Sequence, residues 1–212
     1  MKGLLLKDIY TLKATLRIYA IMMVIYRVIG VVADNMSFLY IVFVLASTVV
    51  PMSAVAYDER CTWGRYSSIL PVNRTQLAIS KYILGLVCLV FCVLSAFAAF
   101  LFSDSMVFAE FFATTVSTTC VAIIYMSLAM PVVYKLGAEK SRVAIFIILL
   151  VPAGLILGGA YLVMKFNFKI PPAILFLLSN DNALLAAIVL FSLVLLAASM
   201  AVSVSIYKKR DF

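Results

Sequence analysis

Residues 82–103, YILGLVCLVFCVLSAFAAFLFS, form a continuous apolar run that contains no charged side chain. A transmembrane helix needs about 20 predominantly apolar residues, so this run is long enough to cross a lipid bilayer. Five further apolar runs lie at 18–33, 38–57, 111–134, 143–164 and 183–206, of which the first is the shortest. The sequence therefore predicts an all-α membrane protein with six transmembrane helices.

The composition agrees with this class of fold and excludes several others. Hydrophobic residues make up 66% of the 212-residue chain, and the mean hydropathy of +1.18 is far above that of a soluble domain. Continuous rather than alternating apolar runs exclude a transmembrane β-barrel. The net charge is +8, but the basic residues lie between apolar runs, so we expect no nucleic-acid partner. The chain has no histidine, and its four cysteines lack metal-ligand spacing, so we expect no metal site.

The basic residues are distributed unequally between the two sides of these runs. Fourteen of the 17 lie on one side: Lys2, Lys7, Lys13, Arg17, Arg60, Arg65, Arg74, Lys81, Lys135, Lys140, Arg142, Lys208, Lys209 and Arg210. The loops on the other side contain only Lys165 and Lys169, together with acidic residues. Because short cytoplasmic loops are enriched in Lys and Arg, we predict that both termini are cytoplasmic.

Residues 1–17 form a separate segment in which apolar residues recur every three or four positions, with basic residues between them. This pattern is typical of a helix that lies in the membrane interface. We therefore divide the chain into an interfacial helix over 1–17 and a transmembrane domain over 18–212. Within that domain, residues 165–182 contain an apolar run after Pro171-Pro172 that is too short to span, so we expect a re-entrant or surface segment there.

The long cytoplasmic loop at 58–81, DERCTWGRYSSILPVNRTQLAISK, is the main candidate for an interaction site. A tight hairpin between two helices needs only roughly 2–8 residues, so this loop is longer than topology requires. Its mixture of apolar, aromatic and basic residues suits the docking of another protein. The candidate docking residues are Asp58, Glu59, Arg60, Trp63, Arg65, Tyr66, Leu70, Pro71 and Arg74. The alternative for each residue is that it belongs to the interfacial aromatic belt or only determines topology.

The local pattern of this loop predicts two helical pieces. A short helix is expected near 60–69, and Pro71 disfavours helix at the residue before it. Asn73 or Thr75 then caps a second helix that continues into the next apolar run, with Gln76 in its first turn.

The opening MKGLLLKDIYTLK and the segment YDERCTWGRYSSILPVNRTQLAISKYI resemble the small six-helix permeases of the ABC-2 transporter superfamily, especially the membrane subunits of phenol-soluble modulin exporters. The resemblance is most specific at Asp58-Glu59, Trp63, Tyr66, Leu70-Pro71-Val72, Arg74 and Ser80-Lys81. It implies that residues 1–17 form an elbow helix and that the loop carries a coupling helix, which inserts into a groove of an ATP-binding subunit. The docking surface would then be Trp63, Arg65 and Tyr66, with Asp58 and Glu59 at its hinge.

The resemblance also implies the surroundings of the chain. It is similar to permeases of the bacterial cytoplasmic membrane that pair as homodimers or heterodimers, contact membrane lipid and assemble with a cytoplasmic ABC ATPase. The sequence has no GxxxxGK[ST] motif, so ATP and Mg would be bound by the ATPase, and the permease is expected to be non-catalytic and free of cofactors. The implied cargo is an amphipathic peptide, of the phenol-soluble modulin or antimicrobial type, or a hydrophobic compound.

Arg27 is the cation within an apolar run, and Asp34 follows seven residues later on the same helical face. Both are candidates for the translocation path, although Arg27 also fits an arginine that extends its side chain to the membrane interface. Two other classes of protein remain as alternatives. A substrate-capture subunit of an energy-coupling-factor vitamin importer also has six helices and no ATPase, but it uses small-residue helix motifs rather than a basic loop. An intramembrane enzyme is disfavoured because the chain lacks histidine and paired intramembrane acids.

Overall fold

The computed structural model describes residues 2–32, 37–61, 63, 66, 73–101, 108–137, 140–141, 143, 147–148 and 181–208. Six helices have defined bounds: α1 (Lys2–Thr11), α2 (Lys13–Val32), α3 (Ser37–Arg60), α5 (Arg74–Phe100), α6 (Phe108–Leu136) and α9 (Asp181–Lys208). These ranges contain no strand, so the predicted all-helical class is confirmed for the part of the chain that they cover.

Four of these helices are long and apolar enough to cross a membrane, over Val42–Arg60, Arg74–Ala98, Phe108–Leu136 and Ala183–Lys208. They coincide with four of the six predicted runs. Helix α2 covers the run at 18–33 but is not among the four. The run at 143–164 and the segment at 165–182 lie almost entirely outside the described residues. The count of six spans and the cytoplasmic placement of the termini therefore stay predictions.

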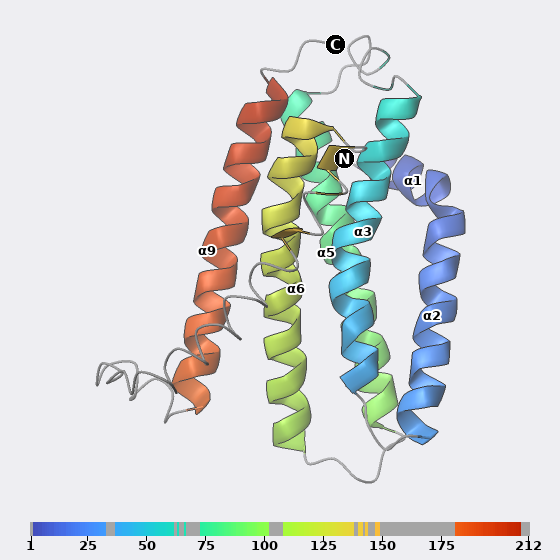
Figure 1. Ribbon diagram of the computed structural model, residues 1–212, viewed down its shortest axis with the longest axis vertical. Coiled ribbons are helices and arrows are strands. Elements are labelled where there is room, and N and C mark those ends of the chain that lie inside the picture. Colours follow the sequence, from blue (N-terminus) through green and yellow to red (C-terminus); the bar gives the residue numbers. More distant parts are fainter. Residues whose placement is uncertain are drawn as a thin grey trace.

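The long helices run side by side along the longest axis of the molecule (Figure 1). Helix α3 packs against α2, α5 and α6, and α9 packs against α6 and α5. The short helix α1 lies across one end of this bundle, where it contacts α3 and α5 as well as α2. We call the end of the bundle that carries Arg60, Arg74 and Lys208 the basic end.

The helical segment expected over 1–17 is divided at Leu12, so that residues 13–17 belong to α2. The hydroxyl of Thr11 donates a hydrogen bond of 2.8 Å to the carbonyl of Lys7, one turn earlier. Such bonds from Thr to the preceding turn often bend helices. Leu12 is fully buried against Val50, Ala54 and Leu84, so the bend inserts an apolar side chain from the α1–α2 junction into the core.

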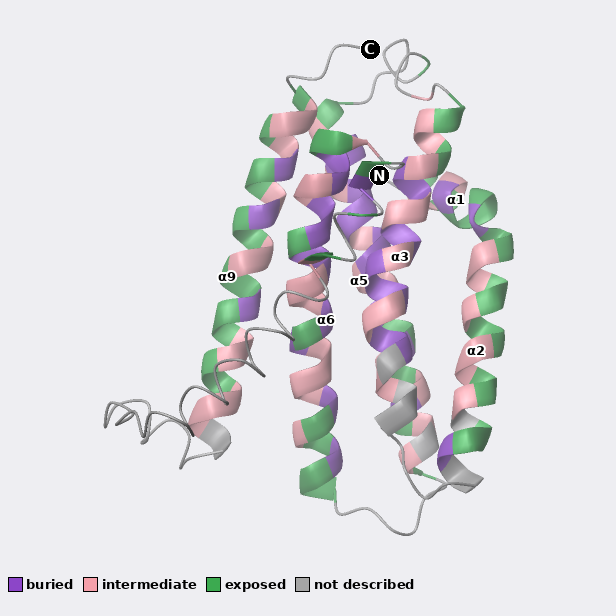
Figure 2. Cartoon of the chain, viewed as in Figure 1, coloured by how far each residue is buried: buried purple, intermediate pink, exposed green. Residues whose placement is uncertain are grey.

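Buried residues are concentrated in α3, α5 and α6, whereas α2 and α9 are mostly exposed or half-buried (Figure 2). Helix α5 approaches its neighbours closely at Gly85, where an added Cβ would lie 2.7 Å from Sδ of Met126 and 3.2 Å from Cγ of Pro51. Small residues allow transmembrane helices to approach closely in this way. Gly85 therefore brings α5 against both α3 and α6.

Helix α9 is attached to the other helices by hydroxyl groups. The Tyr82 hydroxyl is hydrogen-bonded to Ser199 and Ser203 of α9, each at 2.7 Å, and Ser199 donates to the carbonyl of Ser127 at 2.6 Å. Because Ser199 uses its proton on that carbonyl, Tyr82 donates to Ser199 and accepts from Ser203. This chain of hydrogen bonds connects α5, α6 and α9 inside the bundle.

Candidate functional site

The predicted docking residues lie at the basic end, around the stretch between α3 and α5. Helix α3 continues to Arg60 and α5 begins at Arg74, so the connection is residues 61–73 and is shorter than the predicted loop at 58–81. We call residues 61–73 the α3–α5 segment. Six of the nine predicted docking residues are described: Asp58, Glu59, Arg60, Trp63, Tyr66 and Arg74. Arg65, Leu70, Pro71 and the path candidate Asp34 lie outside the described residues, and so does the side chain of Arg27, which is in α2.

The α3–α5 segment ends in the helix start that its sequence predicts. The carbonyl of Asn73 accepts hydrogen bonds from the amides of Gln76 at 2.9 Å and Leu77 at 3.2 Å. In return, the amide of Asn73 donates to Oε1 of Gln76 at 3.4 Å. The reciprocal bond from the third helical residue back to the capping residue is half of a capping box. Asn73, rather than Thr75, is thus the N-cap of α5.

Asp58, in the last turn of α3, is part of a group of four charged side chains that we call the ion cluster: Lys7, Asp8, Asp58 and Lys81. Nζ of Lys81 lies 2.7 Å from Oδ1 of Asp8 and 2.6 Å from Oδ2 of Asp58. Lys7 pairs with Oδ1 of Asp58 and lies 3.4 Å from Oδ1 of Asp8. Asp8 is only 2% exposed and Lys81 only 4%. The ion cluster therefore links α1, α3 and α5 through two lysines and two aspartates whose charges balance.

The ion cluster also contacts the α3–α5 segment. Nζ of Lys7 lies 4.1 Å from the centre of the Trp63 ring, a distance typical of a cation–π interaction. Trp63 in turn packs on Tyr66, with ring centres 5.4 Å apart, and both residues are helical. Tyr66 is 59% exposed, whereas the buried Nε1 of Trp63 has no hydrogen-bond partner among the described residues. Lys7 therefore connects the ion cluster to the pair of Trp63 and Tyr66, in which the Tyr66 ring is exposed.

Arg74 has a structural partner in addition to its predicted docking role. Its guanidinium donates a hydrogen bond of 3.0 Å to the carbonyl of Lys208 in the last turn of α9. Basic side chains commonly bind the free carbonyls at helix C-termini. This contact holds the end of α9 beside the beginning of α5.

Three residues of the ion cluster are not among the predicted site residues. Lys7 and Lys81 are counted in the sequence as charges that determine topology, and Lys81 also contributes to the family resemblance, but neither lysine has a predicted site role. Asp8 is not singled out. A signal was present, because Asp8 is the single acidic residue of the otherwise basic segment 1–17. The pairing itself joins positions 73 residues apart in the chain, which no local pattern indicates.

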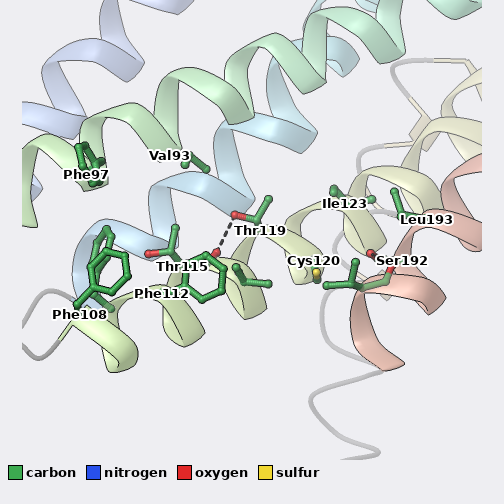
Figure 3. A pocket seen from close by; sticks show the side chains of 13 residues that line it. Val93, Phe97, Phe108, Phe112, Thr115, Thr119, Cys120, Ile123, Ser192 and Leu193 are labelled. Atoms are coloured by element: carbon green, nitrogen blue, oxygen red, sulfur yellow. Dashed lines mark hydrogen bonds between the residues drawn. The ribbon is translucent and has the colours of Figure 1, made fainter. Parts of the chain in front are cut away.

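A second feature lies toward the opposite end of the bundle, where α5, α6 and α9 border a cavity of about 550 Å³. Its walls include Phe97, Phe108, Phe111 and Phe112, and its hydroxyl groups belong to Thr115, Thr119 and Ser192. Figure 3 shows Phe108 and Phe112 at one end of the cavity and Ser192 and Leu193 at the other. The Thr119 hydroxyl is bonded to the carbonyl of Thr115 at 2.7 Å, so the lining is largely apolar and suited to hydrocarbon groups.

Comparison with known protein families gives one match. A family model described as ABC-2 family transporter protein covers residues 3–208, which include the ion cluster, the α3–α5 segment and the cavity. A comparison with curated proteins gave no match. Since the family model extends over nearly the entire chain, and four helices of the described part are able to cross a membrane, this membrane protein belongs to the ABC-2 family of transporter proteins.

Proposed function

We propose that the chain is the permease subunit of an ATP-driven exporter in the bacterial cytoplasmic membrane. A separate ATPase binds ATP and Mg and docks on the α3–α5 segment at the basic end, which faces the cytoplasm. Two permease subunits, identical or related, combine with two ATPases. Membership of the ABC-2 family favours this arrangement over a vitamin-capture subunit, because the latter has no need of an aromatic docking segment.

The observation that carries the proposal is the aromatic pair Trp63 and Tyr66, which is attached to the ends of two membrane helices. Tyr66 is exposed, and Trp63 has an unpaired indole N–H among the described residues. Tryptophan and tyrosine are the residue types that most often dominate the free energy of protein–protein binding. Arg60, three residues before Trp63 in the sequence, is exposed and adds a basic group, which suits an acidic groove on the ATPase.

The positions of α3 and α5 explain how such docking moves the membrane domain. Asp58 lies in the last turn of α3, and Asn73 caps the first turn of α5. A displacement of the segment between them is transmitted to both helices, which pack against each other and, through Gly85, against α6. ATP binding that draws two ATPases together therefore changes the packing of α3, α5 and α6, which is the motion that opens an export path.

For the cargo we propose amphipathic peptides, of the phenol-soluble modulin or antimicrobial type, or hydrophobic compounds. The cavity between α5, α6 and α9 supports this chemistry because its walls are aromatic and aliphatic, with only hydroxyls as polar groups. Its volume of about 550 Å³ is in the range of small-molecule sites, roughly 300–1,000 Å³. It accommodates several apolar side chains or part of an acyl chain rather than a whole folded peptide.

The docking proposal is tested by isolating the tagged permease from its own cells and measuring ATP hydrolysis and the amount of a GxxxxGK[ST]-containing chain that co-purifies. The variant Trp63→Ala/Tyr66→Ala removes the aromatic pair. Truncation of a hot-spot residue costs about 2 kcal/mol or more, so we expect the complex to weaken at least about 30-fold. The control Tyr10→Ala removes a 69% exposed tyrosine of α1 and retains the complex. An ATPase that stays bound to the double variant contradicts the proposal.

A further inference from the structure

Within the ion cluster, Lys81 is not placed like a lysine that only determines the orientation of the helices in the membrane. Lys81 lies about two turns inside α5, where a lysine that only determines topology extends its side chain to water. Instead it is 4% exposed, and it bridges two carboxylates at 2.6 and 2.7 Å. Its placement therefore serves the contact with Asp8 and Asp58.

Asp58 is also placed against the local preference of its helix. It lies in the last turn of α3, where the partial negative charge of the helix dipole disfavours an anion. Lys7 and Lys81 compensate for this, and neither lysine belongs to α3. Buried ion pairs are generally poor sources of stability, and their best-attested role is to specify one arrangement of the elements that they join. Here the elements are α1, α3 and α5.

The orientation of Trp63 depends on the same cluster. Nζ of Lys7 pairs with Asp58 and lies over the Trp63 ring. Lys81 holds Asp8 and Asp58 at a fixed separation, because it binds one oxygen of each. Removing Asp8 or Lys81 changes the position of Lys7 without altering any residue of the α3–α5 segment.

We propose that Asp8 and Lys81 are positioning residues: with Lys7 and Asp58 they fix α1 to the ends of α3 and α5 and hold Trp63 in the orientation that the ATPase recognises. Helix α1 then moves together with the α3–α5 segment during the transport cycle. The role in transport rests on the proposed docking of an ATPase. The positioning of Trp63 is a property of the permease by itself and is measured separately.

The chain contains a single tryptophan, so the emission of the purified permease in detergent micelles, excited at a wavelength that tyrosine does not absorb, reports on Trp63 alone. We compare Asp8→Asn and Lys81→Met with two controls that remove equivalent charges elsewhere. Glu110→Gln changes an exposed carboxylate in the first turn of α6, and Lys135→Met changes an exposed lysine in its last turn. Size-exclusion chromatography verifies that each variant is folded, and if Lys81→Met does not fold, Asp8→Asn alone serves as the disrupting variant, with Lys81→Arg as the variant that keeps the charge.

We expect Asp8→Asn and Lys81→Met to shift the emission of Trp63 and increase its quenching by acrylamide, because the stacked population falls about two- to fivefold when a cation–π contact is lost. Lys81→Arg, which keeps the charge, recovers most of the wild-type emission. Glu110→Gln and Lys135→Met leave it unchanged. Emission that is the same in Asp8→Asn, Lys81→Met and the wild type overturns the positioning role.

The second measurement is the ATP hydrolysis that the permease stimulates in its co-purified ATPase. We expect Asp8→Asn and Lys81→Met to lose most of this stimulation and Lys81→Arg, which keeps the charge, to retain it. If the emission shifts but the stimulation of ATP hydrolysis is intact, the proposal that α1 moves together with the α3–α5 segment is wrong. If the emission shifts but the wild-type permease binds no ATPase, the docking proposal fails while the positioning of Trp63 stands.

Discussion

The ion cluster makes a strong prediction about stability, because the buried Lys81 connects the buried carboxylate of Asp8 with the half-buried carboxylate of Asp58. In Lys81→Met the group retains Asp8 and Asp58 but only Lys7 as a cation, and Oδ2 of Asp8 already has no hydrogen-bond partner among the described residues. Breaking a buried pair by removing one partner costs about 3–5 kcal/mol. For a chain of this length that corresponds to a fall in melting temperature of about 6–20 °C.

Four free cysteines supply the assay for this prediction. Cys92 and Cys120 are buried, Cys88 is half-buried and Cys61 is exposed. A dye that fluoresces when it reacts with thiols labels Cys61 in the folded protein, and its fluorescence increases when unfolding exposes the other three thiols. The matched control is Lys135→Met, which removes an exposed lysine of α6 and is expected to change the unfolding free energy by no more than about 0.5 kcal/mol.

A double variant separates charge balance from loss of contacts. Asp8→Asn/Lys81→Met leaves one cation and one anion, Lys7 and Asp58. We expect it to be more stable than the sum of the two single variants predicts, because residues of one ionic network couple by about 0.5–3 kcal/mol. Additive effects, or a melting temperature for Lys81→Met equal to that of Lys135→Met, would refute the reasoning that the four charges act as a unit.

Three further predictions concern the helices themselves. Gly85→Ala is expected to lower the free energy of unfolding by about 1–3 kcal/mol, because the added Cβ meets Met126 and Pro51. The measurement is thermal unfolding, and Gly3→Ala, with no atom within 4 Å of its added Cβ, is the neutral control. Tyr82→Phe removes the bonds to Ser199 and Ser203 and is expected to cost about 0.6–1.7 kcal/mol, measured in the same way. Val116→Phe narrows the cavity, so we expect slower export of a hydrophobic dye with unchanged ATPase binding. Val121→Phe, on an exposed position of α6 outside the lining, is its control, and equal export by both variants contradicts a transport role for the cavity.

The long helices are predictable from the sequence because hydropathy is a property of contiguous residues. The run at 111–134 lies within α6, and the run at 82–103 matches α5 as far as Phe100. The helix start at Asn73 follows from a capping residue and a glutamine three positions later. The division between α1 and α2 at Leu12 is harder to predict from the sequence. It depends on a hydroxyl bond of Thr11 and on the burial of Leu12 against α3 and α5, and the periodicity of 1–17 continues through it.

The residues of the proposed site also differ in how far the sequence identifies them. Trp63 and Tyr66 are identifiable because aromatic side chains in a long basic segment are unusual enough to suggest docking. Asp8 and Lys81 are not, because their significance comes from a contact across 73 positions of the chain. The cavity also has no local signature, since its phenylalanines and hydroxyls are contributed by three helices and each resembles an ordinary membrane-facing residue.

The cap at Asn73 has a mechanical consequence. The ends of helices normally fray, and local unwinding of a frayed first turn can take up a small displacement, so that the rest of the helix does not move. In α5 the hydrogen bonds between Asn73 and the first turn, including the one to Gln76, cap the helix at its start. This cap reduces fraying of the first turn. We therefore expect a displacement of Asn73 to be transmitted along about 18 Å of helix to the contact of Gly85 with Met126 and Pro51.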